Sequence, residues 1–76
     1  METMTVHGHT VKFDPSGHNI KIGLHYLEDH LSSEEAEPFF TQAKNHSSAQ
    51  FSTSDDYKFT LVHHDSGYYE ITARDY

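Results

Sequence analysis

The clearest structural signal in the sequence is an amphipathic helix, expected over residues 33–46. Ser32 and Glu35 match the capping-box pattern, in which each side chain satisfies a backbone amide at the start of a helix. Pro38 is compatible with this helix only near its first turn. The apolar side chains recur at the i, i+3, i+4 and i+7 spacing of one helix face, and they are Ala36, Phe39, Phe40 and Ala43. Such a helix has to cover a second apolar surface.

A meander of three strands after this helix can supply that surface. The expected strands are residues 49–53, 57–64 and 68–74. A three-residue turn at residues 65–67 places Leu61 opposite Ile71. The preceding turn places Phe51 opposite Phe59 in the same way. One face of this sheet is then apolar, and it carries Phe51, Phe59, Leu61, Tyr69, Ile71 and Ala73.

The residues before the helix are expected to form a second β-hairpin, with strands at residues 5–13 and 19–24. Both segments alternate between apolar and polar side chains. The turn between them, at residues 14–17, has the Asp-Pro-Ser-Gly composition that favours a type I turn. From Leu24 onward the leucines follow a helical spacing, which predicts a short helix or an irregular turn before Ser32.

These elements predict one small α+β domain over residues 1–76. Its antiparallel sheet has about five strands in the order ββαβββ, and one principal helix packs on one face. The apolar share is 34%, or nearer 40% with the four glycines, which is low beside the roughly 45–50%, glycine included, of typical soluble domains. A thin core is therefore expected, and the chain has no cysteine with which to form a disulfide.

Composition also suggests where such a chain would work. The absence of cysteine fits a reducing compartment, and a cytoplasmic location is the expectation. The first residues lack the basic and apolar regions of a signal peptide, and no apolar run is long enough to cross a membrane. We therefore expect a protein that neither enters a membrane nor is made as a precursor.

The charge balance restricts the class of partner. Twelve acidic residues against five basic ones give a formal net charge of −7, which opposes binding to nucleic acid or to an anionic membrane. The sequence therefore favours a protein partner with a basic surface. The eight histidines would bring the net charge to +1 if all were protonated, so mild acid should change the charge strongly.

An acidic cluster before and within the predicted helix is the best candidate for contacting such a partner. Its residues are Glu28, Asp29, Glu34, Glu35 and Glu37. No lysine or arginine lies between Lys21 and Lys44 to balance them. The alternative is a solvated helix start whose carboxylates only complement the helix dipole. Tyr68, expected on the outer face of the sheet, is a further candidate contact, although exposed tyrosines also simply favour strands.

Three histidines raise the question of a metal site. His7 and His9 would point the same way on a strand, and His18 could join them across the first hairpin. Neither a further ligand nor a hydrogen-bond acceptor that would orient each imidazole ring can be identified. We therefore favour histidines that fill polar gaps, with casual metal affinity as the alternative, and we expect no metal site and no cofactor.

Two patterns resemble catalytic groups. His25 and Asp29 have the i, i+4 spacing of a hydrogen-bonded pair, but no nucleophile is placed beside them. Residues 63–67 read His-His-Asp-Ser-Gly, but neighbours on one tight turn cannot adopt the geometry of a hydrolytic triad. No phosphate-binding or dinucleotide-binding motif is present. We therefore expect no catalytic residues and no enzymatic activity.

The function expected from the sequence is that of a small acidic binding protein, either an inhibitor or an adaptor that covers a basic surface of a partner. That surface could be one that evolved for nucleic acid. Small acidic proteins encoded by phages and mobile elements often work in this way, an analogy of size and charge only. The alternative is a metal- or pH-responsive accessory protein that uses the histidines, followed by a structural subunit. Self-association is compatible with each.

Overall fold

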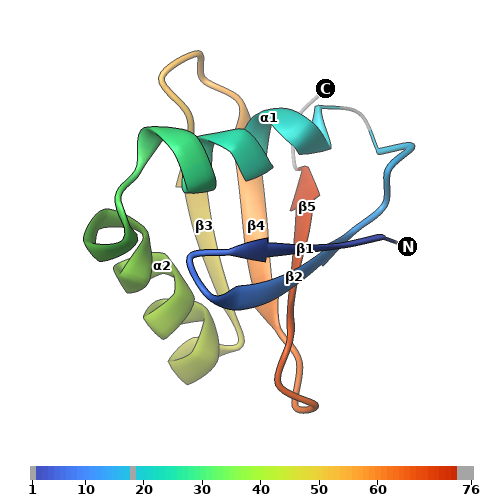
Figure 1. Cartoon of the computed structure of the whole chain (residues 1–76), viewed down its shortest axis with the longest axis vertical. Helices are drawn as coiled ribbons and strands as arrows, with labels where there is room; N and C mark the ends of the chain where they lie inside the picture. Colours follow the sequence, from blue (N-terminus) through green and yellow to red (C-terminus); the bar gives the residue numbers. More distant parts are fainter. Residues whose placement is uncertain (1, 18, 74–76) are drawn as a thin grey trace.

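A computed structural model describes residues 2–17 and 19–73 of the chain as a mixed five-stranded sheet with its helices on one side (Figure 1). Along the chain the elements are β1 (Glu2–Val6), β2 (His9–Phe13), α1 (Ile20–His25), the π-helical turn η1 (Tyr26–His30), α2 (Ser33–His46), β3 (Ser48–Ser52), β4 (Lys58–His63) and β5 (Tyr69–Ala73). The α+β class and the five strands are confirmed. The expected antiparallel sheet is wrong at one pairing, because β2 and β5 run parallel in the order β1-β2-β5-β4-β3.

Helix α2 has the bounds that the sequence predicts. Its capping box is formed, with the Glu35 amide donating to the Ser32 hydroxyl at 3.2 Å and the Ser32 amide donating to the Glu35 carboxylate at 2.9 Å. Pro38 lies beyond the first turn, so the carbonyl of Glu34 loses the amide donor that another residue at position 38 would supply. Phe40 is buried and Phe39 is partly buried, which fixes the face that α2 turns to the sheet.

The meander of β3, β4 and β5 also forms in the predicted register. Leu61 pairs with Ile71, and Phe51 pairs with Phe59. The register could be predicted because apolar and polar side chains alternate along these strands. A shift of one residue would turn the apolar side chains of a strand toward solvent. The five strands and the two helices enclose a core of buried side chains: Val6, Val11, Phe13, Ile20, Leu24, Leu27, Ala36, Phe40, Ala43, Ala49, Phe51, Phe59, Leu61, Tyr69 and Ile71.

The predicted N-terminal hairpin is wrong. Its first strand, residues 5–13, is broken by a two-residue turn in which His7 and Gly8 both have positive φ, at 50° and 84°. This pair of angles is typical of a type I′ turn, and it folds β1 back onto β2. Gly8 was the sequence signal for this turn, because glycine adopts positive φ without steric cost. The predicted turn at residues 14–17 does form, with the Gly17 amide donating to the Asp14 carbonyl at 2.9 Å.

Residues 20–25 form helix α1 instead of the predicted strand. Their apolar residues fit both periods, since Ile20, Leu24 and Leu27 also recur at helical spacing. Burial distinguishes the helix from the strand. Ile20 and Leu24 face the core, whereas Ile22, which a strand would also bury, is 36% exposed. The predicted short helix after Leu24 corresponds to the end of α1 and to η1.

Gly23 allows α1 to approach the sheet closely. A Cβ atom at this position would lie 2.9 Å from two ring carbons of Phe59 and 3.0 Å from the Cδ1 atom of Ile71. Both neighbours are buried, so neither can move aside easily. A side chain at residue 23 would therefore have to push α1 away from the sheet.

Gly23→Ala is expected to lower the free energy of unfolding by up to about 2 kcal/mol. Overpacking of a core costs about 1–3 kcal/mol, and the better helix propensity of alanine returns about 1 kcal/mol. Urea denaturation followed by circular dichroism measures the change. Lys21→Ala, at an exposed position of the same helix, is the control and should stay within about 0.5 kcal/mol of wild type. An increase in stability in Gly23→Ala would contradict the close packing.

Within the described ranges, none of the helices combines the length and the apolar character needed to traverse a lipid bilayer.

Candidate functional site

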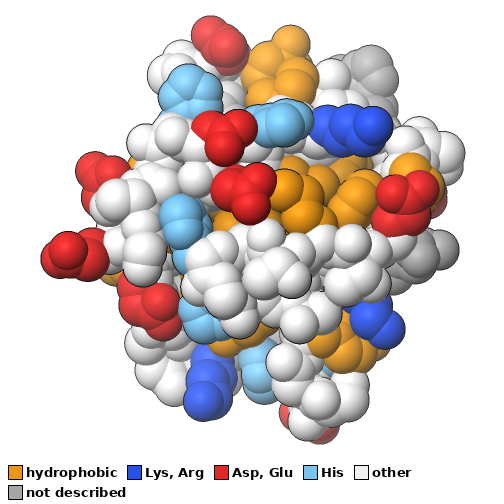
Figure 2. Space-filling view, in the orientation of Figure 1, with side chains coloured by type: hydrophobic (Ala, Val, Ile, Leu, Met, Phe, Trp, Pro, Cys, Tyr) orange, Lys and Arg blue, Asp and Glu red, His pale blue; other side chains and the backbone are white. Residues whose placement is uncertain are grey.

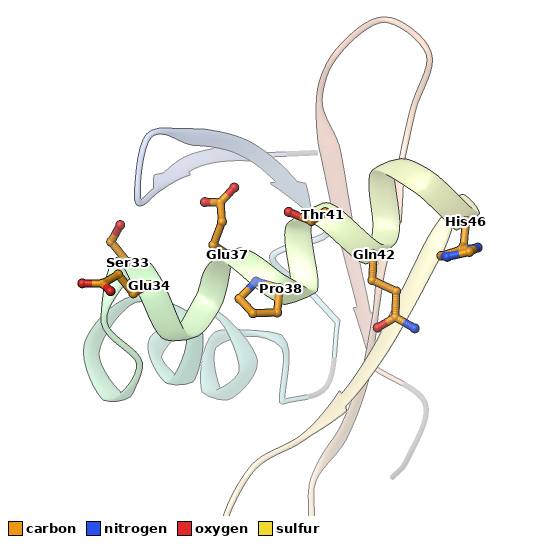
Figure 3. A pocket seen from close by; sticks show the side chains of 7 residues that line it. All are labelled: Ser33, Glu34, Glu37, Pro38, Thr41, Gln42 and His46. Atoms are coloured by element: carbon orange, nitrogen blue, oxygen red, sulfur yellow. The ribbon is translucent and has the colours of Figure 1, made fainter.

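The outward-facing side of α2 forms the main candidate site. We call it the α2 face, and its residues are Ser33, Glu34, Glu37, Pro38, Thr41, Gln42 and His46. They follow one another at helical spacing on the side opposite the buried Ala36, Phe40 and Ala43. Figure 3 shows their side chains along the length of the helix. Because all seven residues come from one helix, this is an open surface and not an enclosed cavity.

Hydrogen-bond acceptors are concentrated at the N-terminal half of the α2 face. Glu34 and Glu37 present two carboxylates one helical turn apart, and Pro38 lies beside them. Basic side chains carry several N–H donors and no acceptor. This part of the face is therefore chemically complementary to lysine and arginine.

Glu37 connects the α2 face to the β1–β2 hairpin. Its side chain points toward that hairpin in Figure 3, and a carboxylate oxygen lies 3.2 Å from the Nε2 atom of His9. The Glu37 side chain is nevertheless 53% exposed, so one side of the carboxylate still faces solvent. The His9 ring also stacks on Phe40, with 4.1 Å between the ring centroids. The hairpin thus holds Glu37 in a defined position.

The remaining predicted acidic residues occupy different environments. Glu35 is exposed, but its carboxylate accepts the Ser32 amide in the capping box. Asp29, on η1, lies 3.0 Å from the Nδ1 atom of His25, which confirms the expected i, i+4 contact. Glu28, also on η1, is half-buried. The structure therefore brings Glu34 and Glu37 together on one surface and gives Glu35 and Asp29 local partners.

Several acidic side chains lie over α2 at the left of Figure 2, and others lie toward the centre and at the top, right and bottom of the view. Two of the lysines, Lys12 and Lys58, lie on strands next to the buried residues Val11 and Phe59. Since successive side chains of a strand point to opposite faces, both lysines point away from the helices. The helical side carries the carboxylates of the α2 face together with Lys21 and Lys44, and the other side carries Lys12, Lys58 and Glu70.

Tyr68 does not belong to the α2 face. It precedes β5 and points away from the core, as the sequence predicted, because its neighbour Tyr69 is buried. Its ring stacks on that of His64 at 4.5 Å, and the Nζ atom of Lys12 lies 4.2 Å from its centroid. His64 in turn lies 2.9 Å from a carboxylate oxygen of Glu70. Tyr68 is therefore held by its neighbours on the other side of the sheet.

The premise that His7 and His9 point the same way is wrong. His7 lies in the β1–β2 turn, and its Nε2 atom is 2.8 Å from the Leu27 carbonyl oxygen and 3.0 Å from that of Leu31. An imidazole N–H donates there, whereas the His9 ring is directed at Glu37. His18 lies outside the described residues. Among residues 2–17 and 19–73, no three His, Asp or Glu side chains are grouped so that they could hold a metal ion.

Tyr69 is a buried titratable group close to Glu37 of the α2 face. It is 6% exposed, and its ring meets that of Phe40 edge-on, with 4.9 Å between centroids. Burial raises the pKa of the Tyr69 phenol above its ordinary value of 10.0, and the Glu37 carboxylate raises it further.

This raised pKa predicts a loss of stability in alkaline solution. Above about pH 10 the unfolded chain binds fewer protons at this residue than the folded protein, so the free energy of unfolding falls as the pH rises. Tyr69→Phe should therefore lose less stability than wild type between about pH 9 and pH 11. Denaturation at each pH measures this, with Tyr68→Phe as the control. An equal alkaline loss in Tyr69→Phe and wild type would contradict the prediction.

A second hollow lies between the first helical segment and the β3–β4 connection. It has a volume of about 280 Å³ and is lined by Lys21, Ile22, His25, Tyr26, His30, Thr53, Ser54 and Asp55. Pockets for small organic ligands usually have about 300–1,000 Å³. His25 and Asp29 form a pair at its rim, and both side chains are more than half exposed. Both side chains therefore remain in contact with water, whereas catalytic groups usually lie in a site from which water is excluded.

Sequence reasoning identified Glu34 and Glu37 on the α2 face and missed the other five residues. The sequence does contain a pattern for three of these five, since Pro38, Gln42 and His46 follow Glu34 at intervals of four residues, the spacing of one helix face. Projecting the predicted helix would have placed them opposite the apolar stripe. Comparisons with protein-family models, with curated proteins and with solved structures gave no match to this chain.

Proposed function

We propose that this chain is a small acidic binding protein without enzymatic activity, and that it covers a basic surface of a protein partner with its α2 face. The observation that carries the proposal is the position of Glu34 and Glu37 one turn apart on an exposed helix face. An inhibitor or adaptor of this kind would act by occupying the partner's surface, as small acidic proteins of phages and mobile elements do.

Electrostatics supports the proposal. The net charge of −7 would draw a basic partner from a distance, and the carboxylates of Glu34 and Glu37 on the α2 face would orient the encounter. Pro38 and the stems of Thr41 and Gln42 offer contact area along the same face. His9 holds Glu37 in position, and the capping box fixes the start of the helix. Both contacts reduce the entropy that would be lost on binding.

A comparative capture experiment tests the proposal. Immobilised wild type, a Glu34→Lys/Glu37→Lys variant and an Asp55→Lys/Asp65→Lys control would each be exposed to extract from cells that make the protein. Both variants change the net charge equally, but only the first alters the α2 face. The proposal expects a basic protein that wild type and the control retain and that the α2-face variant loses. Equal retention by all three proteins would contradict it.

A further inference from the structure

His9 is a titratable side chain in direct contact with a carboxylate of the α2 face. Its Nε2 atom lies 3.2 Å from the Oε2 atom of Glu37, which points toward the hairpin in Figure 3. The two residues are 28 positions apart in the sequence, so the contact exists only while the β1–β2 hairpin is docked on α2. The net charge at this point of the α2 face therefore depends on whether His9 carries a proton.

Packing fixes the His9 ring beside Glu37. The ring stacks on Phe40 with 4.1 Å between centroids and 19° between planes, and it meets the Tyr69 ring edge-on at 5.4 Å. Phe40 and Tyr69 are buried, so they leave the imidazole little freedom to turn away from the carboxylate. The His9 side chain is still 26% exposed, so its ring can exchange a proton with water.

Several other charged or titratable groups surround His9. Strand β1 places the apolar Val6 opposite it. The surrounding groups come from α2, from β5, from β4 and from its own hairpin, and they are Glu37, Lys44, Tyr69, His63 and His7. Lysine and tyrosine ordinarily keep their charge between pH 5 and pH 8.

The two neighbouring histidines have contacts of their own. The His63 ring packs on Tyr69, with 5.1 Å between centroids. The Nε2 atom of His7 is directed at the carbonyl oxygens of Leu27 and Leu31. His9 is therefore the histidine of this group whose proton acts directly on Glu37.

We propose that His9 makes the α2 face responsive to pH, because a protonated His9 neutralises Glu37 in mild acid and releases a basic partner. Histidine is the side chain that ordinarily changes charge between pH 5 and pH 8. A neutral imidazole donates one N–H to Glu37 and leaves the negative charge in place, whereas an imidazolium forms an ion pair without net charge. Glu34 then keeps the unbalanced charge of the pair. This inference rests on the proposed function and adds its regulation.

His64 provides a matched control for His9. Its Nε2 atom lies 2.9 Å from a carboxylate oxygen of Glu70, and its ring stacks on Tyr68. The same kind of contact thus occurs on the other side of the sheet, away from the α2 face. The control is needed because protonation of all eight histidines would change the net charge from −7 to +1 and weaken attraction to a basic partner everywhere.

Nuclear magnetic resonance of the protein alone tests the change of charge without a partner. Between pH 7.5 and pH 5.5 the side-chain carboxyl ¹³C resonance of Glu37 should move in step with the ring resonances of His9. This coupled step should be absent in His9→Gln and present in His64→Gln, with circular dichroism establishing that each variant is folded. A Glu37 resonance that does not follow His9, or that moves equally in His9→Gln, would overturn the proposal.

Calorimetric titration with the captured basic protein measures the effect on binding. The ratio of Kd at pH 5.5 to Kd at pH 7.5, at constant ionic strength, should be about three- to fivefold larger in wild type and His64→Gln than in His9→Gln. Glu37→Gln removes the charge permanently and keeps an acceptor for His9. It should show the small ratio of His9→Gln, which keeps the test decisive if His9→Gln fails to fold.

The two measurements separate this inference from the proposed function. If no basic protein is captured, the proposed function is wrong, and the Glu37 resonance still decides whether His9 controls the charge of the face. If a basic protein binds through the α2 face but wild type and His9→Gln lose affinity equally in acid, the control by His9 is wrong and the proposed function stands.

Discussion

Replacing Phe59 with alanine is expected to lower the free energy of unfolding by about 3–5 kcal/mol. Phe59 is fully buried, its ring stacks on Phe51 at 5.5 Å, and the backbone of Gly23 lies against it. The cavity left by the ring would open between α1 and the middle of the sheet. Small domains have total stabilities near the lower end of about 5–15 kcal/mol, so this variant should be largely unfolded at room temperature.

Phe39→Ala is the matched control for Phe59→Ala. The sequence placed both phenylalanines in the core, but Phe39 is only partly buried, with its ring 5.6 Å from that of Phe51. Its loss should therefore cost less than that of Phe59. Thermal and urea denaturation of both variants measure the difference. Near-wild-type stability of Phe59→Ala, or a larger loss in Phe39→Ala, would mean that the core is elsewhere.

Reversing the two carboxylates of the α2 face should weaken binding of a basic partner about tenfold or more. In Glu34→Lys/Glu37→Lys each attraction becomes a repulsion at the centre of the proposed contact. Glu35 is left unchanged because its side chain caps the helix, so its reversal would confuse binding with helix stability. Glu37→Lys also ends the contact with His9, and circular dichroism should therefore accompany the measurement.

Two comparisons make the reversal interpretable. Asp55→Lys/Asp65→Lys changes the net charge by the same amount on turns at the two ends of the β-meander, and it should weaken binding much less. His9→Gln leaves both carboxylates in place and tests the contact with the hairpin separately. If the affinity of the folded Glu34→Lys/Glu37→Lys variant equals that of wild type, the partner binds elsewhere, and the surface around Tyr68 would be the next candidate.

The C-terminal two thirds of the fold could be predicted because several local signals agree there. The capping box, the apolar stripe of α2 and the Gly67 turn each fix a boundary or a register. The alternation in β3 and β4 then places Phe51 opposite Phe59 without ambiguity. In this part of the chain, residue propensity, apolar periodicity and turn residues all favour the same arrangement. The local preferences and the tertiary contacts therefore agree, and local reasoning gives the observed structure.

The N-terminal third could not be predicted because its signals conflict. Ile20 and Leu24 fit both a strand and a helix, and only contact with the sheet at Gly23 favours the helix. The parallel pairing of β2 with β5 joins segments nearly sixty residues apart, at Val11 with Tyr69 and Lys12 with Glu70. No local pattern in the sequence encodes such a pairing.

The candidate site could be predicted in part. The position of Glu34 and Glu37 on the exposed side of α2 follows from the helix itself. The contact between Glu37 and His9 could not be foreseen, because it depends on the β1–β2 turn at His7 and Gly8. For the same reason the supposed histidine group on one strand does not form. Tyr68 lies outside the acidic surface because β5 turns it to the other side of the sheet.

The dependence of the association rate on salt tests the central claim most directly. With the captured partner in purified form, stopped-flow mixing at increasing ionic strength should show a rate constant that falls steeply for wild type. Screening shortens the reach of the acidic surface to about 8 Å at physiological salt and less above it. The Glu34→Lys/Glu37→Lys variant should associate more slowly and with a weaker salt dependence. A rate constant that is independent of salt and equal in the two proteins would contradict the account.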